Sequence, residues 1–308
     1  MNKTPIILDC DTGVDDAIAI MLAAQVPQFD LRAVTTVAGN VELEKTTANT
    51  LRILELIDSN VPVYAGAKSP LFREPVTAEH VHGEDGLGGI KLPLNKTVQS
   101  STHAWDAIFH EALRCKGSLE LVAVGPLTNL ALAFLKLADL PNLLNRIVIM
   151  GGSATSGNVT PAAEFNVFAD PQAAEIVFNS GVPVYMCGLD VTLKSYFTIQ
   201  DIKMIGEIGN QPARFFQEVL LALTPAYKKF GLPGVCLHDP MTVLYAENDS
   251  IFETHHVGIH VEMKGKLTLG KTVTDLYSDK KMEKNAYIVT DVDREAFQAR
   301  VHELMSSY

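Results

Sequence analysis

The chain has 308 residues, of which 47% are hydrophobic and 20% are charged, and its formal net charge at pH 7 is -11. A chain of this composition can bury a large core, which excludes an intrinsically disordered protein. The negative charge excludes non-specific binding to nucleic acid or to an anionic membrane, because the electrostatic interaction would be repulsive.

The first two thirds of the chain alternate between strand-like and helical apolar patterns. Predicted strands cover residues 5–8, 31–37, 61–64, 119–124, 147–150 and 182–187, and predicted helices cover residues 15–24, 42–57, 105–115, 130–137 and 171–178. Such alternation is typical of βαβ units. It predicts an α/β fold: a single large Rossmann-like domain over residues 1–308, with a mostly parallel central sheet and helices on both faces.

The pattern changes after residue 199. Helices are predicted over residues 213–223 and 240–246, strands over residues 257–261, 272–277 and 285–289, and a final helix from residue 294. We expect the late strands to extend the same sheet at an edge, some of them antiparallel.

Residues 74–95 have no clear periodicity and contain four glycines. Loops of this length without regular structure are commonly functional. We therefore expect an active-site lid at residues 74–95.

The cysteines and the start of the chain both bear on location. The N-terminus has no basic segment, and no apolar stretch is long enough to cross a bilayer. The cysteines are far apart and form no C-x-x-C pair, which favours reduced core thiols. They are Cys10, Cys115, Cys187 and Cys236. We expect a cytoplasmic protein.

Four carboxylates follow the first predicted strand, namely Asp9, Asp11, Asp15 and Asp16. The carboxyl ends of strands hold the ligand sites of open α/β sheets. Crowded carboxylates repel one another unless they are neutralised, and ligand sets made only of oxygen suit hard ions such as Ca²⁺ or Mg²⁺. One Asp could simply cap a helix, but four within eight positions exceed what a helix start uses. The cluster predicts a divalent metal site.

Further polar residues follow other predicted strands, at residues 38–40, 125–129, 150–152 and 164–166. Each could be a turn or cap residue by itself, but their shared position favours a site for sugar hydroxyls. His238 and Asp239 precede a predicted helix. An imidazole there suits proton transfer near neutral pH, and the adjacent carboxylate could join the metal site.

Together these motifs resemble the inosine–uridine nucleoside hydrolases, a family of metal-dependent N-ribosyl hydrolases. The resemblance is carried by DCDTGVDDA at residues 9–17, TTVAGN at 35–40, HGE at 82–84, VGPLTN at 124–129, MGG at 150–152, AEFN at 163–166, DP at 170–171 and HD at 238–239. The motifs occur in the family's order. Thr12 stands where the family usually has proline, which removes no ligand.

The resemblance implies a Ca²⁺ ion and assigns roles to individual residues. Its ligands would be Asp11, Asp16, Asp239 and the backbone carbonyl of Val124. The ribose would be bound by Asp15, Asn40, Met150, Asn158, Glu164, Asn166 and Asp239. His82 and His238 would lie on the side of the base, where Phe165 and Phe230 are candidates for stacking.

The implied reaction is hydrolysis of the N-glycosidic bond of ribonucleosides such as uridine, cytidine or inosine. Positive charge develops on the ribosyl ring, so nearby carboxylates would stabilise it. Asp11 and the metal would activate the water, and His238 would assist departure of the base. The resemblance also implies a homodimer or homotetramer that acts in nucleoside salvage.

Two other functions remain open from the sequence alone. Asp9 and Asp11, two residues apart at a strand end, also fit a phosphotransferase of the haloacid dehalogenase type. A non-catalytic, calcium-dependent ribonucleoside sensor would need the same ribose site. The choice between purine and pyrimidine bases is not determined by these motifs.

Overall fold

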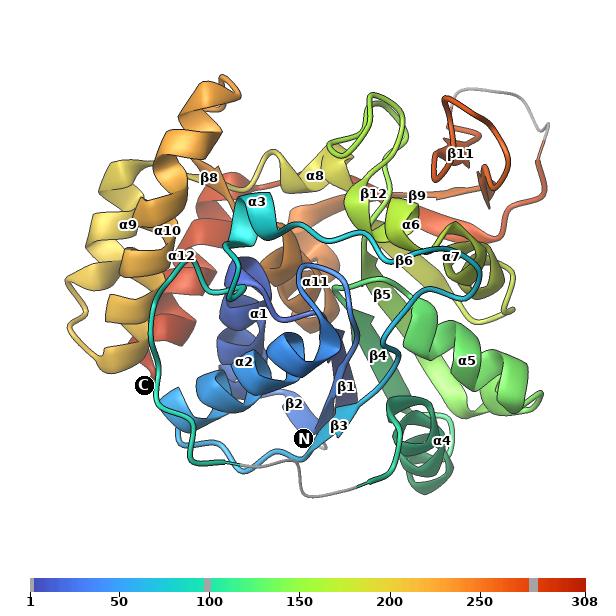
Figure 1. Ribbon diagram of the computed structural model, residues 1–308, viewed down its shortest axis with the longest axis horizontal. Helices are drawn as coiled ribbons and strands as arrows, with labels where there is room; N and C mark the ends of the chain where they lie inside the picture. Colours follow the sequence, from blue (N-terminus) through green and yellow to red (C-terminus); the bar gives the residue numbers. More distant parts are fainter. Residues whose placement is uncertain (1–2, 97–100, 277–281) are drawn as a thin grey trace.

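The computed structural model describes residues 3–96, 101–276 and 282–308, and its centre is an eight-stranded sheet (Figure 1). The strand order is β3-β2-β1-β4-β5-β6-β12-β9. The strands are β1 (Thr4–Cys10), β2 (Phe29–Thr36), β3 (Val63–Ala65), β4 (Leu119–Ala123), β5 (Leu144–Met150), β6 (Val184–Cys187), β12 (Ala286–Val292) and β9 (Phe252–Val257). All neighbours run parallel except β12 and β9, which are antiparallel. The predicted α/β fold is confirmed.

Helices cover both faces of this sheet (Figure 1). One face carries α1 (Val14–Gln25), α2 (Leu43–Leu56), α10 (Gln211–Lys229), α11 (His238–Glu247) and α12 (Arg294–Ser306), and the other carries α4 (Ala104–Cys115), α5 (Thr128–Lys136) and α7 (Pro171–Phe178). Successive residues of β1 enter opposite cores: Ile6 and Leu8 face α1, whereas Ile7 faces α4 and α5. Burial on both faces explains why the central strands contain uninterrupted apolar runs, such as residues 6–8, 121–123 and 147–150.

The remaining elements are short, apart from the two-turn helix α9. They are the helices α3 (Glu79–His82), α6 (Phe165–Ala169), α8 (Leu189–Thr192) and α9 (Ile199–Gly206), the 3-10 helices η1 (Leu140–Leu143) and η2 (Asp249–Ile251), and the strands β7 (Tyr196–Phe197), β8 (Val235–Cys236), β10 (Ile259–Val261) and β11 (Thr272–Thr274).

The expectation that all late strands extend the central sheet is only partly correct. β12 and β9 do so, but β10 and β11 form a separate antiparallel pair. The predicted strand 257–261 divides at Gly258, after which Val261 donates its N–H to the Glu175 carboxylate of α7. This bond holds β10 against α7, outside the central sheet. β11 ends at Thr274, and Tyr277, the last residue of the predicted strand 272–277, lies outside the described residues.

Residues 74–95 contain one short helix, α3, and otherwise only turns and extended chain. They are held against α2 by an ion pair of 3.3 Å between Lys45 Nζ and Glu79 Oε1 and by a hydrogen bond of 2.8 Å from Asn49 Nδ2 to the Asp85 carbonyl. Figure 1 shows α3 above α1 and α2. The segment therefore covers the start of α1.

The four cysteines are free thiols, as the sequence predicts, but only three of them are buried, because Cys115 at the end of α4 is partly exposed. Among the helices of the described residues, none is long and apolar enough to cross a membrane.

Candidate active site

The strand order reverses around β1, with β2 and β3 on one side and β4 and β5 on the other. The loops that follow β1 and β4 diverge at such a point, and the crevice between them is where open α/β sheets bind ligands. Asp11 follows β1, Asn40 follows β2, Val124 follows β4, and Met150 ends β5. The sheet thus gathers these predicted site residues at one edge.

Four carboxylates meet in this crevice. Carboxylate oxygens of Asp15, Asp16 and Asp239 lie within 4.8 Å of one another. Asp15 and Asp16 come from the first turn of α1, Asp239 from the first turn of α11, and Asp11 lies beside Asp16. Burial, followed by the negative charges of Asp15 and Asp16, raises the pKa of Asp239.

Asp16 organises the loop between β1 and α1. Its Oδ1 accepts the Asp11 N–H at 3.0 Å, and its Oδ2 accepts the Gly13 N–H at 2.9 Å and Asn40 Nδ2 at 3.0 Å. Burial first, and then the negative charge of Asp15, raises the pKa of Asp16 to about 6. Asp16 therefore caps the helix and belongs to the acidic cluster at once, so the two interpretations of the sequence do not exclude each other.

Asp11 is fully buried and closely surrounded by backbone. Its Oδ2 accepts the Asn40 N–H at 2.7 Å, whereas its buried Oδ1 has no hydrogen-bond partner among the described residues. A Cβ atom on Gly39 would lie 2.1 Å from Oδ2, and one on Gly125 would lie 2.7 Å from Oδ1. Glycine at both positions lets the backbone close around this carboxylate.

The donor set fits a hard divalent cation. Asp11, Asp16 and Asp239 are buried carboxylates, and the Val124 carbonyl lies in the same crevice. Burial and then the charge of Asp16 raise the pKa of Asp11, so the cluster binds protons more readily than ordinary carboxylates do. A cation would replace those protons, and Asp11 Oδ1 offers it an oxygen that no protein donor occupies.

Asn166 and Glu164 form a hydrogen-bonded network on the β5 side of the crevice. Asn166 Nδ2 donates to the carbonyls of Val124 at 2.8 Å and Met150 at 3.0 Å. Glu164 is the N-cap of α6, and its carboxylate accepts the N–H groups of Asn166 and Gly152 at 2.9 and 2.8 Å. Burial raises the pKa of Glu164 to about 7. Both side chains are therefore rigidly placed.

The two predicted histidines lie on the other side of the crevice. His82 Nδ1 accepts the Val14 N–H at 3.2 Å, which ties residues 74–95 to the start of α1. His238 Nδ1 lies 2.8 Å from Thr192 Oγ1, and its Nε2 lies 3.2 Å from the Tyr227 hydroxyl. Burial lowers the pKa of both imidazoles. Both rings are thus neutral at pH 7 and held by hydrogen bonds.

Comparison with known proteins agrees with this geometry. The chain matches the inosine-uridine preferring nucleoside hydrolase family over residues 6–299. The chain belongs to this family. It is therefore an N-ribosyl hydrolase, and the phosphotransferase alternative is set aside.

Individual relatives of this nucleoside hydrolase cover nearly its whole length. It is 42% identical over 307 residues to the pyrimidine-specific ribonucleoside hydrolase RihA of Photobacterium profundum, with 99% of each chain covered. It is 43% identical over 307 residues to RihA of Salmonella arizonae, again with 99% of each chain covered. Among solved structures, the purine-preferring ribonucleoside hydrolase from Gardnerella vaginalis superimposes with a TM-score of 0.92 at 31% identity, with 98% of each chain covered.

Three predicted site residues of the nucleoside hydrolase lie apart from the buried network. Asn158 is exposed, and its Oδ1 accepts the Phe165 N–H at 2.9 Å. Phe165 is half-buried at the start of α6. Phe230 follows the end of α10 and is 72% exposed. In this arrangement Phe230 is the least enclosed of the proposed base-side residues.

Several residues that the sequence analysis did not assign support the site. Asn129 Nδ2 donates to Asp9 Oδ1 at 2.7 Å and to the Thr36 carbonyl at 3.0 Å, so it joins the ends of β1 and β2. Thr35 also donates to Asp9. Asn129 lies in a motif that the sequence analysis quoted, but nothing near Tyr227 or Thr192 in sequence signals their contact with His238.

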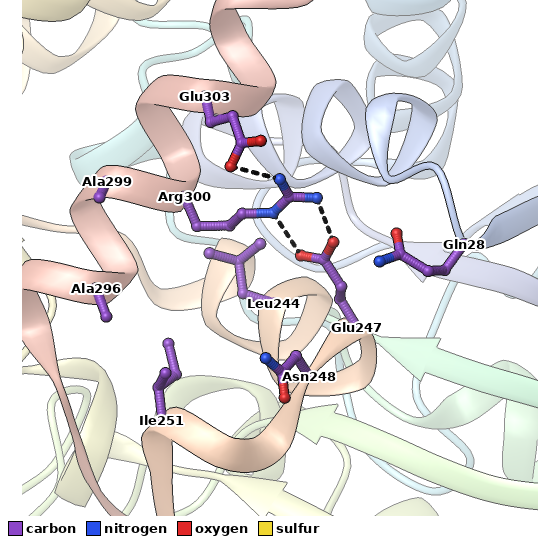
Figure 2. A pocket seen from close by; sticks show the side chains of 9 residues that line it. All are labelled: Gln28, Leu244, Glu247, Asn248, Ile251, Ala296, Ala299, Arg300 and Glu303. Carbon is purple, nitrogen blue, oxygen red and sulfur yellow. Dashed lines mark hydrogen bonds and ion pairs between the residues drawn. The ribbon is translucent and has the colours of Figure 1, made fainter.

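The cavity shown in Figure 2 lies elsewhere in the nucleoside hydrolase. It has a volume of about 480 Å³, and its lining includes Gln28, which precedes β2, and Asn248, which follows α11. These positions belong to the amino edge of the sheet, opposite the acidic cluster. Figure 2 shows Arg300 between Glu247 and Glu303, so its charge is already paired. None of the candidate site residues lines this cavity.

The raised pKa values predict that the metal-free enzyme is less stable at higher pH. Burial raises the pKa of Glu164 from 4.5 to about 7 and that of Asp16 from 3.8 to about 6. Between these values the folded state binds more protons than the unfolded state, so the free energy of unfolding falls as pH rises from about 4 to about 7. Glu164 alone would lower the free energy of unfolding by about 3 kcal/mol across this pH range.

The measurement is the free energy of unfolding in EDTA between pH 5 and pH 8. We expect Glu164→Gln to flatten the dependence. Added Ca²⁺ should remove the part of the pH dependence that is due to Asp16, a proposed ligand of the ion, and leave the part that is due to Glu164. A stability that rises with pH in EDTA would contradict the assignment.

Proposed function

We propose that this nucleoside hydrolase cleaves pyrimidine ribonucleosides, uridine and cytidine ahead of inosine, into ribose and free base in a Ca²⁺-dependent reaction. The base preference rests on the relatives described as pyrimidine-specific, which are 42–43% identical, against 31% for the purine-preferring structural neighbour. The observation that carries the reaction is the buried Asp11 Oδ1, unpaired among the described residues, within an acidic cluster in the crevice that His238 borders.

Calcium would be held by Asp11, Asp16, Asp239 and the Val124 carbonyl. When bound, it supplies Lewis acidity and lowers the pKa of water. Asn166 supports this arrangement, because its amide fixes the Val124 carbonyl at 2.8 Å while a second lone pair of that oxygen stays available.

Asp11 would act as the general base. The Asn40 N–H holds its Oδ2, which leaves both lone pairs of Oδ1 available, one for the cation and one to accept a proton from the water that adds to C1′. As the bond from C1′ to the base nitrogen breaks, positive charge develops on the ribosyl ring. The carboxylates of Asp15 and Asp239 would stabilise this charge.

The electron pair of the broken bond stays on the base, which then gains a proton. His238 would supply this proton, with Thr192 and Tyr227 keeping its ring in one orientation. The proton comes from the imidazolium form of His238: the ring takes up a proton before the bond breaks, a form that the negative charge of Asp15 favours, and it returns to the neutral imidazole when it protonates the base.

The ribose hydroxyls would contact both sides of the crevice. On the β2 side we propose Asp15 and Asn40, and on the β5 side Asn166. Glu164 and Asn158, with Met150, would receive the 5′-hydroxyl. Support comes from the buried network that joins Glu164, Asn166 and the backbone of Met150.

Residues 74–95 would form a lid over the base, with His82 as its contact residue. The bond from Val14 N–H to His82 Nδ1 supports a closed position of this segment. The homodimeric or homotetrameric state, the cytoplasmic location and the role in nucleoside salvage are also proposals, and they rest on the sequence and on family resemblance.

The first test measures ribose release from uridine, cytidine, inosine and adenosine. The assay is repeated after EDTA treatment and again after Ca²⁺ or Mg²⁺ is added back. We expect release from the two pyrimidine nucleosides, loss in EDTA and recovery with Ca²⁺. Equal rates on inosine and uridine would overturn the base preference, and activity that survives EDTA would overturn the metal requirement. Stoichiometric binding without turnover would instead indicate the ribonucleoside sensor.

A further inference from the structure

The segment that begins two residues after β5, residues 152–155, is fixed by two elements that lie outside the crevice. Figure 1 shows the loop that joins β5 to α6 between α8 and the β10–β11 pair. Asp190 belongs to α8, Thr272 begins β11, and Lys271 precedes it. The proposed reaction assigns no role to these three residues.

Thr272 holds Ser153 through a single hydroxyl. The Ser153 N–H donates to Thr272 Oγ1 at 2.8 Å, and Thr272 Oγ1 donates to the Ser153 carbonyl at 2.7 Å. The hydroxyl thereby satisfies both backbone groups of one residue. Thr272 is 1% exposed, so water does not compete for these bonds.

Asp190 and Lys271 hold the next two residues. Asp190 Oδ2 accepts the Ala154 N–H at 2.7 Å, and its Oδ1 accepts the Thr155 hydroxyl at 2.9 Å. Lys271 Nζ donates to the carbonyls of Ser153 and Thr155, each at 2.8 Å. Side chains from two separate elements therefore order this segment, which has no regular secondary structure of its own.

Gly152 connects the held segment to Glu164. Its carbonyl accepts the Leu189 N–H at 3.0 Å, and its N–H donates to Glu164 Oε2 at 2.8 Å. A Cβ atom on Gly152 would lie 2.7 Å from the Thr272 methyl carbon, so the backbone and Thr272 are in direct contact. Movement of the segment would therefore move a donor to the Glu164 carboxylate.

We propose that Thr272 and Asp190 are positioning residues that, through Gly152, hold Glu164 in place for the ribose 5′-hydroxyl. The proposal rests on the proposed function, because that function assigns the 5′-hydroxyl to Glu164. Fixing the segment in advance removes the entropy cost of ordering it when substrate binds. A carboxylate displaced by a fraction of an ångström would lose its hydrogen bond to a small hydroxyl group.

The test compares uridine with 5′-deoxyuridine in Thr272→Val and Asp190→Asn. We expect each variant to lower kcat/KM for uridine about 10- to 100-fold, mainly through KM, and to change kcat/KM for 5′-deoxyuridine less than about 3-fold. Thr272→Ser keeps the hydroxyl and should behave like the wild type. Thr274→Val makes the same change two residues along β11 and serves as the matched control.

Hydrogen–deuterium exchange gives a second readout that does not depend on activity. In Thr272→Val we expect faster exchange across residues 152–155 and at the Asn166 and Val167 amides that donate to Glu164. Unchanged exchange there, or equal losses on the two substrates, would overturn the positioning role. A wild-type enzyme without preference for uridine over 5′-deoxyuridine would instead overturn the 5′ assignment made in the proposed function.

Discussion

Asp11→Asn is expected to lower kcat/KM for uridine by at least about 10⁴-fold. The variant removes the proposed general base and one of the proposed calcium ligands while it keeps the shape of the side chain. The introduced amide can still accept the Asn40 N–H through its oxygen, so the loop after β1 should keep its conformation. The measurement is ribose release at saturating Ca²⁺, together with a calorimetric titration of Ca²⁺.

Stability separates loss of chemistry from loss of fold in this variant. Burial and the charge of Asp16 raise the pKa of Asp11, so its ionised carboxylate destabilises the metal-free fold at neutral pH. We expect Asp11→Asn to be at least as stable as the wild type in EDTA and to gain less stability from Ca²⁺. Asp106→Asn, at a surface ion pair with Lys136, is the matched control and should keep full activity. Activity above a tenth of the wild-type value in Asp11→Asn would contradict the assignment.

His238→Ala is expected to lower kcat for uridine by about 10²- to 10⁴-fold but to slow 4-nitrophenyl riboside less than about 10-fold. Departure of uracil requires a proton or equivalent stabilisation, whereas nitrophenolate leaves readily without one. Removal of an acid therefore affects only the poor leaving group. The measurement is kcat for both substrates with the same enzyme preparation.

Two further variants test whether the contacts of His238 matter. Tyr227→Phe and Thr192→Val each remove one hydroxyl that lies at a ring nitrogen of His238. We expect each variant to lower kcat less than His238→Ala does, and the decrease should again be larger for uridine than for 4-nitrophenyl riboside. Equal losses on both substrates in His238→Ala would mean that His238 binds the substrate but is not its acid.

The local parts of the site could be predicted from the sequence. A buried strand, a turn and a helix within residues 5–25 place Asp11, Asp15 and Asp16 together, because their separation along the chain is short. The same reasoning identified the polar residues that follow β2, β4 and β5. Apolar periodicity shows which residues face a core, and the alternation of strands and helices implies a parallel sheet.

The contacts between distant parts of the chain were decided only by the tertiary structure. Periodicity does not specify which strand pairs with which, so the separation of β10 and β11 from the central sheet was missed. The contacts of His238 with Tyr227 and Thr192 join three different segments, and no local sequence pattern predicts them. The same holds for Thr272, whose hydroxyl group bonds to Ser153, a residue 119 positions away in the chain.

The sequence by itself therefore determined the fold class, through the alternation of strands and helices, and the residue types of the acidic cluster, through their short separation along the chain, while its motifs carried the resemblance to the family. Tertiary structure alone decided how each carboxylate is satisfied. Asp16 is held by backbone and amide donors, Asp11 Oδ1 has no protein donor among the described residues, and Glu164 is fixed through Gly152. The physical reason is that burial and hydrogen bonding, which set the pKa of each carboxylate, depend on packing between elements that are far apart in the chain.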